Sequence, residues 1–258
     1  MLGRRIVTAL ILAPAVLGAI AVGGWAIPAA VLAVVALAAY ELAQALKPLP
    51  FLALFGAGAL PVLLSIPYGT SGALAGALLG LPNALFWLAA RPESRALGAL
   101  LALLLMALWV GAPLSHLGLL QELPGGTYLI LVAVVGPWVN DAGAYFAGRL
   151  LGRRKLSPIL SPNKTYEGAI GALLLTVAAV VPFASMFLGL GSVQAALLGL
   201  AISAFSQVGD LFESVLKRLL ELKDLGSVLP GHGGILDRID SLLFTAPAVY
   251  YLYALFVL

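Results

Sequence analysis

Residues 193–216, VQAALLGLAISAFSQVGDLFESVL, form an apolar run in which carboxylates appear only toward the C-terminal end. A helix needs about 20 mostly apolar residues to cross a bilayer, so this run is long enough to do so. Similar runs recur along the 258-residue chain, which is 62% hydrophobic and only 10% charged. Its mean hydropathy is +1.08. We therefore expect an all-α, polytopic integral membrane protein.

Charged residues, prolines and glycines divide the apolar sequence into nine candidate spans. They cover residues 6–23, 25–46, 49–66, 71–90, 95–114, 127–148, 166–188, 193–216 and 238–257. We expect one transmembrane domain over residues 1–258. Within it, residues 1–126 would supply N-terminal helical spans, and residues 127–258 would supply catalytic spans with cytoplasmic loops.

All 14 Lys and Arg residues fall on one side of this nine-span arrangement. They are Arg4, Arg5, Lys47, Arg91, Arg95, Arg149, Arg153, Arg154, Lys155, Lys164, Lys217, Arg218, Lys223 and Arg238. Cytoplasmic loops retain basic residues, so this side and the N-terminus are expected in the cytoplasm, with the C-terminus opposite. The first apolar run could alternatively be a cleaved signal. Retaining it as a span fits the charge pattern.

Several simpler features narrow the function. The absence of cysteine excludes disulfides, thiolate metal sites and a cysteine nucleophile. The net charge of +3 follows from membrane topology and gives no reason to expect nucleic acid as a partner. Gly72, Gly76 and Gly80 recur every fourth residue, which favours close helix packing in lipid.

Carboxylates from five spans gather in one layer at the cytoplasmic interface. They are Glu41, Asp141, Glu167, Asp210, Glu213, Asp237 and Asp240, whereas Glu122 falls on the outer side. Asp141, for example, lies about 21 Å along its span at 1.5 Å per residue. Ionisable groups within a membrane are costly, so each needs a partner, a cavity or a function.

Two helix ends in this layer each carry a pair of carboxylates. One end carries Asp210 and Glu213. Gln207, Asp210, Ser214 and Lys217 form a stripe there of residues three or four apart. The other has Asp237 and Asp240, with Ser241 beside them. Residues at this spacing share a helical face, and hard oxygen ligands suit a divalent cation. The alternative is that neighbouring basic residues merely neutralise the acids in structural ion pairs.

Two polar segments adjoin these helix ends. Pro230–Gly234 reads PGHGG, in which exposed backbone N–H groups could approach a phosphate, although a glycine-rich turn without a ligand is common. Residues 161–168 read SPNKTYEG, whose Ser161, Asn163 and Thr165 are candidate helix caps. Lys164 in this segment is a candidate substrate contact, whereas the basic run at 149–155 could simply bind anionic lipid head groups.

The polar residues together resemble those of a known family. From Ser214 to Asp240 the chain carries S-x-x-K-R, then K-D-x-G, then L-P-G-H-G-G-I-x-D-R-I-D. This pattern resembles the phosphatidate cytidylyltransferases, also called CDP-diacylglycerol synthases. Asn140-Asp141, SPNKTYEG and Q-x-G-D-x-x-E-S over residues 207–214 are also similar to that family. The resemblance covers roughly residues 133–245, and the first five spans match only as hydrophobic helices.

The resemblance implies an enzyme of phospholipid biosynthesis that joins CTP to phosphatidate, giving CDP-diacylglycerol and pyrophosphate. It implies Mg²⁺, a possible second, monovalent cation such as K⁺, and the cell (inner) membrane, with the active site facing the cytoplasm. The bilayer is an expected partner, and a homodimer is left open. Phosphatidate would keep its acyl chains in the bilayer while CTP arrives from the cytoplasm, so both phosphates would meet at the layer of carboxylates.

The family pattern also suggests roles for individual residues. Metal binding is expected of Asp210 and Asp237, with Asp141 and Glu213 as weaker candidates. Catalytic roles are expected of Ser214, Lys217, Arg218 and Asp240, the last also a weaker metal candidate. Substrate binding is expected of Lys164, Glu167, Lys223, Asp224, His232, Gly233, Gly234 and Arg238. Asp224 and His232 are placed near the nucleotide by the motif alone, and no residue marks a cytosine pocket.

The expected mechanism follows from charge. A phosphate monoester has a second pKa of about 6, so the attacking group is already largely ionised and needs no strong base. Repulsion between anions and the charge on departing pyrophosphate oppose the reaction. Metal ions and basic side chains should therefore supply most of the catalysis.

Three other functions compete with this interpretation. A CTP-dependent lipid-alcohol kinase needs the same kinds of residues. A CDP-alcohol phosphotransferase should show D-G-x-x-A-R, which is absent. A cation or proton transporter should carry polar groups through the full depth of the membrane, whereas the outer halves of these spans contain almost none.

Overall fold

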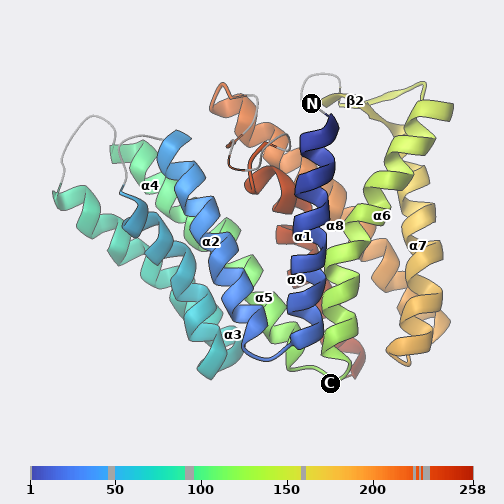
Figure 1. Cartoon of the computed structure of the whole chain (residues 1–258), viewed down its shortest axis with the longest axis horizontal. Coiled ribbons are helices and arrows are strands. Elements are labelled where there is room, and N and C mark those ends of the chain that lie inside the picture. The colour runs from blue at the N-terminus through green and yellow to red at the C-terminus, as the bar shows by residue number, and fades with distance from the viewer. Residues whose placement is uncertain are drawn as a thin grey trace. The chain divides into compact units, whose positions relative to one another are not determined.

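The computed structural model describes residues 2–45, 50–90, 96–157, 161–222, 225–226, 228 and 233–257 (Figure 1). The elements are α1 (Leu2–Val22), α2 (Ala26–Ala45), α3 (Phe51–Ala90), α4 (Ala96–Leu104), a π-helical segment (Leu105–Gly111), α5 (Ala112–Gln121), α6 (Gly126–Leu151), β1 (Lys155–Ser157), β2 (Ser161–Thr165), α7 (Tyr166–Phe187), α8 (Ser192–Leu219) and α9 (Leu236–Val257). In the described part of the chain, seven helices are long and apolar enough to cross a membrane. The prediction of a helical, polytopic membrane protein is confirmed.

The chain forms two compact units. One contains Met1–Leu119 together with Asp224–Ile239, and the other contains Leu120–Lys223 together with Asp240–Leu258. The first division, between Leu119 and Leu120, falls within α5, and the boundary at residues 126 and 127 stays a prediction. However, the glycine-rich segment after α8 groups with the N-terminal helices, which the sequence does not indicate.

In the first unit, α3 is a helical hairpin. Gly69 interrupts it with φ 60° and ψ −141°, a conformation that glycine adopts without steric cost. The second arm returns along the first, since Asn83 Nδ2 donates to the Ala53 carbonyl oxygen at 3.2 Å. The expected spans 49–66 and 71–90 are these two arms, which Figure 1 shows side by side.

The glycine stripe on the second arm of α3 allows this close packing. A Cβ on Gly72 would meet the backbone of Leu64, and one on Gly76 would lie 2.5 Å from Pro61 Cα. Gly80 instead faces Ala107, whose Cβ would be 2.8 Å away. The prediction that these glycines support helix packing is confirmed.

Glycines also bring the helices of the second unit together. A Cβ on Gly143 of α6 would lie 2.9 Å from Ala172 Cα of α7, and one on Gly199 of α8 would lie 3.0 Å from Val177 Cα. The Thr245 hydroxyl of α9 donates to the Ala133 carbonyl at 3.2 Å. The backbones of α6, α7 and α8 can therefore approach closely and position polar groups from three helices together.

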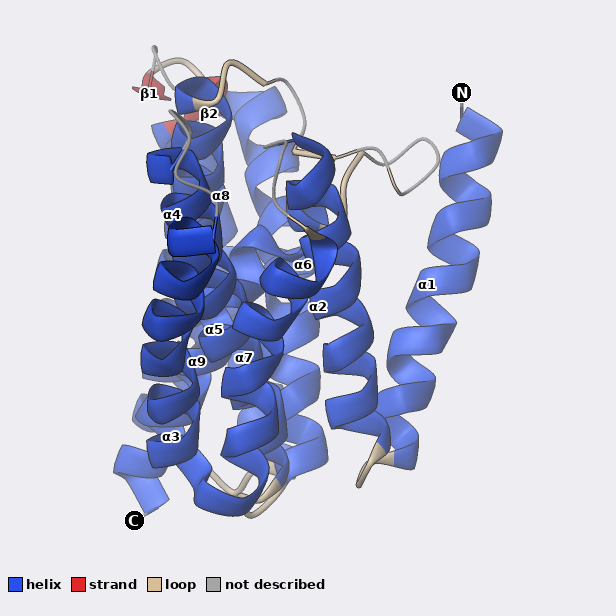
Figure 2. Ribbon diagram, turned by 90° about the vertical axis from the view of Figure 1, so that its left-hand side faces the viewer, coloured by secondary structure: helices blue, strands red, loops and turns tan. Residues whose placement is uncertain are grey.

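A short β-hairpin accompanies the helices of this all-α fold. Lys155–Ser157 and Ser161–Thr165 pair as a short antiparallel hairpin, drawn as strands in Figure 2. Thr165 then caps α7, because its Oγ1 accepts from the N–H of Gly168 at 3.1 Å. The predicted cap is confirmed for Thr165, whereas Ser161 and Asn163 lie within β2.

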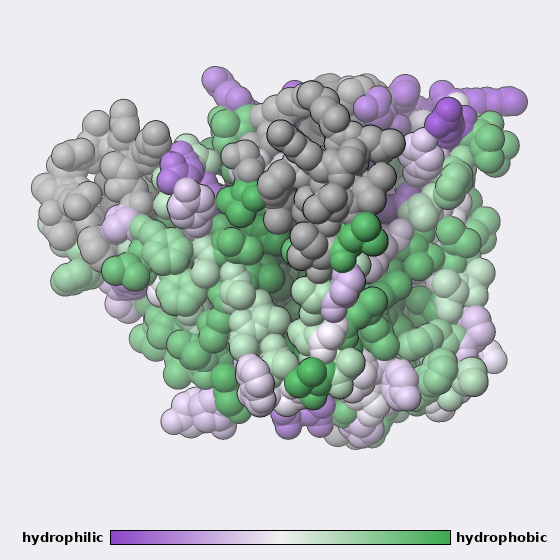
Figure 3. Space-filling model, in the orientation of Figure 1, coloured by the Kyte–Doolittle hydropathy of each residue, from purple (hydrophilic) through white to green (hydrophobic). Residues whose placement is uncertain are grey.

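The exterior suits a lipid environment. On the face drawn in Figure 3, hydrophobic side chains cover the middle and hydrophilic ones gather toward the two ends. Large apolar side chains on helices are well exposed, including Leu74, Phe86, Leu174 and Leu255. In water such exposure would be costly, but in a bilayer these side chains would contact acyl chains.

Candidate functional site

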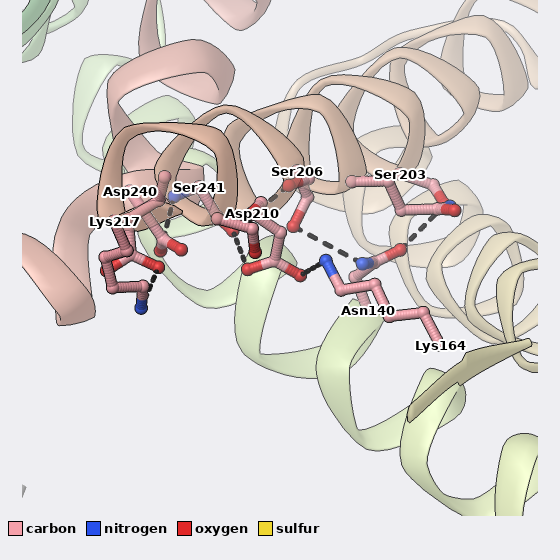
Figure 4. A network of polar contacts seen from close by, with 11 residues as sticks. Asn140, Lys164, Ser203, Ser206, Asp210, Lys217, Asp240 and Ser241 are labelled. Atoms are coloured by element: carbon pink, nitrogen blue, oxygen red, sulfur yellow. Dashed lines mark hydrogen bonds and ion pairs between the residues drawn. The ribbon is translucent and has the colours of Figure 1, made fainter. Parts of the chain in front are cut away.

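A polar cluster in the second unit centres on Asp210, near the C-terminal end of α8 (Figure 4). One oxygen of Asp210, Oδ2, pairs with Lys164 Nζ of β2 at 2.8 Å. Its other oxygen, Oδ1, accepts from the Ser241 hydroxyl of α9 at 3.4 Å. Both side chains of the ion pair are 27% exposed, so a ligand could reach them.

Two further carboxylates lie next to Asp210. Asp240 is buried, and its side chain is within hydrogen-bonding range of Asp210 and electrostatic range of Glu213. Glu213 is also buried and pairs with Lys217 at 2.8 Å. The structure thus brings three carboxylates together with two lysines, all of them residues that the sequence singled out.

Gly209 allows this arrangement. A Cβ at this position would lie 2.5 Å from the Asp240 carbonyl oxygen and 2.8 Å from Ser241 Cα. The Ser241 hydroxyl also donates to the Ser206 carbonyl at 3.2 Å. The backbones of α8 and α9 therefore touch beside Asp210, which holds its carboxylate against the first turns of α9.

A buried amide network lies deeper between the helices. Asn140 of α6 is 1% exposed, and its Nδ2 donates to Ser206 Oγ at 3.3 Å. Its Oδ1 accepts from Ser203 at 2.7 Å and from Thr176 at 3.5 Å. This network joins α6, α7 and α8. The sequence pointed to Asn140 only through its place beside Asp141 and gave no signal for the two serines.

A pocket of about 280 Å³ opens between these elements. It is lined by Asn140, Ala144, Tyr145, Leu156, Ser161, Asn163, Lys164, Thr165, Gly168, Ala169, Gln207 and Asp210. The ion pair of Lys164 and Asp210 therefore belongs to its wall. Mixed amide, charged and apolar groups in one pocket are typical of binding sites for small molecules. Asn163 and Gln207 are pocket residues to which the sequence assigned no binding role.

In the first unit, carboxylates bind the backbone of described residues before and at the start of α9. Asp237 Oδ2 accepts from the N–H of Gly234 at 2.8 Å, and its Oδ1 accepts from that of Leu225 at 3.4 Å. Gly233 has φ 82°, where a side chain would be strained. Glu41 of α2 accepts from the N–H groups of Ile235 and Leu236. Glu41 had been noted only as a member of the acidic layer.

Several predicted residues take other positions. The Ser214 hydroxyl donates to the Asp210 carbonyl one turn earlier, at 2.8 Å, so it would have to rotate to donate to a substrate. Glu167 accepts from the backbone N–H groups of Arg153 and Arg154 at 3.0 and 3.2 Å, which fixes the start of the β-hairpin. The side chains of Asp141, Arg218 and Arg238 are exposed. Lys223, Asp224 and His232 lie outside the described residues.

The donor chemistry suits a hard metal ion, although the described side chains are not already arranged as such a site. Carboxylate oxygens of Asp210, Glu213 and Asp240 are the ligand type that Mg²⁺ prefers. Among the residues that the structure describes, however, no group of three or more His, Asp or Glu side chains is arranged as a metal site. Two of the three acids are paired with lysines instead. The metal-binding roles therefore stay predictions.

Comparison with known proteins gives a consistent family assignment. The model of the cytidylyltransferase family matches residues 3–256. A phosphatidate cytidylyltransferase of Bacillus subtilis (strain 168) is 48% identical over 133 residues, which are 51% of this chain and 49% of the relative. One of Staphylococcus haemolyticus (strain JCSC1435) is 46% identical over 125 residues, 47% of each chain. The matches thus span about half the length of these relatives. On the match across residues 3–256, the chain belongs to the cytidylyltransferase family.

Proposed function

We propose that this protein is a phosphatidate cytidylyltransferase, which converts CTP and phosphatidate into CDP-diacylglycerol and pyrophosphate. The observation that carries the proposal is the Lys164–Asp210 pair, which lines a pocket and joins a cluster of acids near the ends of apolar helices. Family membership and the names of the two bacterial relatives support it. The phosphate groups of the lipid and of the nucleotide both need a charged site. The acyl chains of the lipid need apolar surface beside that site.

The reaction forms one bond and breaks one bond. A phosphate oxygen of phosphatidate would attack the α-phosphorus of CTP, and the bond from that phosphorus to the β-phosphate oxygen would break, releasing pyrophosphate. Lys164 and Lys217 would leave their carboxylate partners to hold substrate phosphates. Because lysine ammonium groups are compact charges on flexible chains, this exchange of partners is physically reasonable.

Acidic residues would hold the metal ion. Asp210, together with the neighbouring acids Glu213 and Asp240, would hold Mg²⁺, which when bound neutralises phosphate charge and stabilises the leaving group. Asp237 stays a predicted metal ligand. Release of Asp210 and Glu213 from their lysines by arriving phosphates would free oxygens for the metal. Arg238 and the N–H groups at Gly233 and Gly234 would bind nucleotide phosphates, for which the N–H of Gly234 would have to leave Asp237.

We also propose the topology that such a reaction needs. Nine spans with a cytoplasmic N-terminus put all 14 basic residues on the side where CTP is available. Counting both arms of α3 and the apolar α1 gives this number from the described helices. The active site would then face the cytoplasm at the inner membrane.

One assay tests the proposed reaction. Purified protein in detergent is given CTP and Mg²⁺ with either phosphatidate or a polyprenol. Pyrophosphate and CDP-diacylglycerol formed only with phosphatidate are the expected result. Release of CDP with phosphorylated polyprenol would instead identify a lipid-alcohol kinase and refute the proposal. Omission of Mg²⁺ should abolish turnover, which tests the metal requirement separately.

A further inference from the structure

Glu41 is a buried carboxylate in the N-terminal half of the chain, which the proposed reaction leaves without a role. Its side chain is 1% exposed on α2, among apolar neighbours such as Leu42 and Ala38. Burying a carboxylate is unfavourable unless hydrogen bonds compensate for lost hydration. A leucine could be buried there without that cost. The hydrogen bonds that Glu41 accepts are therefore what its carboxylate adds at this position.

The hydrogen bonds that the structure describes for Glu41 come from backbone N–H groups at the start of α9. Oε1 accepts from the N–H of Ile235 at 2.8 Å, and Oε2 accepts from that of Leu236 at 3.2 Å. The backbone of Val228 also lies near the Glu41 carboxylate. Ile235 and Leu236 lie at the start of α9, where N–H groups have no partner within the helix and a negative charge is favourable. The Glu41 carboxylate thus connects α2 to the start of α9, which is distant from it in sequence.

Glycines make room for this carboxylate. A Cβ on Gly226 would overlap the Glu41 carboxyl group. A Cβ on Gly234 would lie 2.6 Å from Glu41 Oε2 and 3.0 Å from Asp237 Oδ2, so Gly234 passes between the two acids. Asp237 binds the N–H groups of Gly234 and Leu225. Glu41 and Asp237 therefore hold the same segment from two helices.

We infer that Glu41 is a positioning residue, whose carboxylate fixes the described backbone at Gly226 and Gly234 and the first turn of α9 for nucleotide binding. The inference rests on the proposed function for its effect on CTP, because that function assigns Gly233, Gly234 and Arg238 to the nucleotide phosphates. Among the described residues, Glu41 accepts hydrogen bonds from the backbone N–H groups of Ile235 and Leu236, to which no substrate contact is assigned, and it lies beside Gly234. Its loss should therefore act through the segment and affect CTP more than phosphatidate.

Glu41→Gln is the sharpest test, since it preserves shape while replacing one acceptor oxygen by an amide donor. Loss of a charged hydrogen-bond partner should increase amide hydrogen exchange over residues 225–239 by about tenfold or more. The KM for CTP should rise by about tenfold, while the KM for phosphatidate changes by less than about twofold. Glu41→Asp, which keeps the charge but is shorter, should recover part of both effects. Glu122→Gln, the same exchange in an exposed loop, is the matched control.

Hydrogen exchange and the KM values test different parts of the inference. Unchanged hydrogen exchange in Glu41→Gln would overturn the positioning role, whatever the activity. Faster exchange with equal increases in both KM values, or with a loss of kcat alone, would overturn the claim that Glu41 affects CTP binding more than phosphatidate binding. If the wild-type protein does not turn over CTP with phosphatidate, the proposed function fails, while hydrogen exchange still decides whether Glu41 fixes the segment. Should Glu41→Gln not fold, Glu41→Asp gives the same comparison with a smaller expected change.

Discussion

Asp210 is the residue at which the polar contacts of the second unit converge. It binds Lys164 and Ser241 and lies beside Asp240. Asp210→Asn should abolish CTP turnover in detergent, with a fall in kcat of about 100-fold or more, because the amide cannot replace a charged metal ligand. Turnover of CTP by the purified variant measures this. Detergent removes any membrane gradient, so the assay measures CTP turnover and not transport. Retained turnover in Asp210→Asn would exclude Asp210 from the metal site.

Lys164 offers a second test at the same pair. If it exchanges Asp210 for a substrate phosphate, Lys164→Met should reduce kcat/KM by roughly 10- to 100-fold, the effect of losing a charged hydrogen bond. Lys155→Met is the matched control, because Lys155 lies in the paired strand with an exposed side chain. Equal activities of the two variants would contradict a phosphate-binding role for Lys164.

Individual residues differ in how far the sequence revealed them. Asp210, Lys164 and Lys217 were predictable, because ionisable groups are costly in an apolar chain and therefore mark candidate functional sites. Helical spacing also places Asp210 and Lys217 on one face. Glu41 and Asn140 were not assigned roles, since their partners lie 194 and 66 residues away in sequence. Local spacing carries no information about such pairs. Only tertiary packing shows which backbone or hydroxyl group each side chain reaches.

At the scale of elements, the contact between α8 and α9 depends on Gly209. Gly209→Ala would place a methyl group 2.5 Å from the Asp240 carbonyl, so α8 and α9 must separate beside Asp210. We expect a loss of about 1–3 kcal/mol in the free energy of unfolding, together with reduced activity. Gly118→Ala in α5 meets no atom within 4 Å and should change stability by no more than about 1 kcal/mol. Thermal unfolding in detergent would compare them, and equal effects would contradict this packing argument.

The interface of α6, α7 and α8 depends on the buried amide of Asn140. Asn140→Ala removes hydrogen bonds to Ser206, Ser203 and Thr176, and should cost about 1–2 kcal/mol of stability, near the upper end for polar contacts in membranes. Asn83→Ala removes one described hydrogen bond, to the Ala53 carbonyl, and should cost less. Chemical unfolding in mixed micelles would measure both. A larger loss in Asn83→Ala would contradict the importance of the network.

The elements show why apolar patterns predict spans better than their connections. The expected spans differ from the observed helices by only a few residues at most ends. The hairpin of β1 and β2 was missed, because three to five residues are too few to show a period of two. The segment 95–114 was also too short, since the helical path continues through a π-helical turn to Gln121. Polar loops carry few constraints that sequence periodicity can detect.

At the scale of the whole molecule, the charged stretch from Ser214 to Asp240 does not belong to one unit. Its glycine-rich part groups with the N-terminal helices, and its start and Asp240 group with the C-terminal ones. The N-terminal spans had been expected to supply only helical surroundings. Through Glu41, they instead contribute hydrogen bonds to a segment that carries assigned substrate contacts.

The proposed topology can be tested directly, because the chain has no cysteine to remove. Nine spans with α3 as a hairpin put Tyr68 and Glu122 on the outer side and Arg153 in the cytoplasm. Single variants Tyr68→Cys and Glu122→Cys should react with an impermeant maleimide from outside sealed right-side-out vesicles. Arg153→Cys should react only in inverted vesicles.

Tyr68 is the decisive position among the three. It is 68% exposed and lies next to Gly69, where the direction of α3 reverses. If α3 instead crossed the membrane once as a long helix, residue 68 would lie near mid-bilayer, where a thiol does not react with a water-soluble maleimide. An unreactive Tyr68→Cys that reacts normally after detergent is added would therefore refute nine spans. Labelling from outside would support the reversal at Gly69 and, with it, a cytoplasmic position for the basic loops.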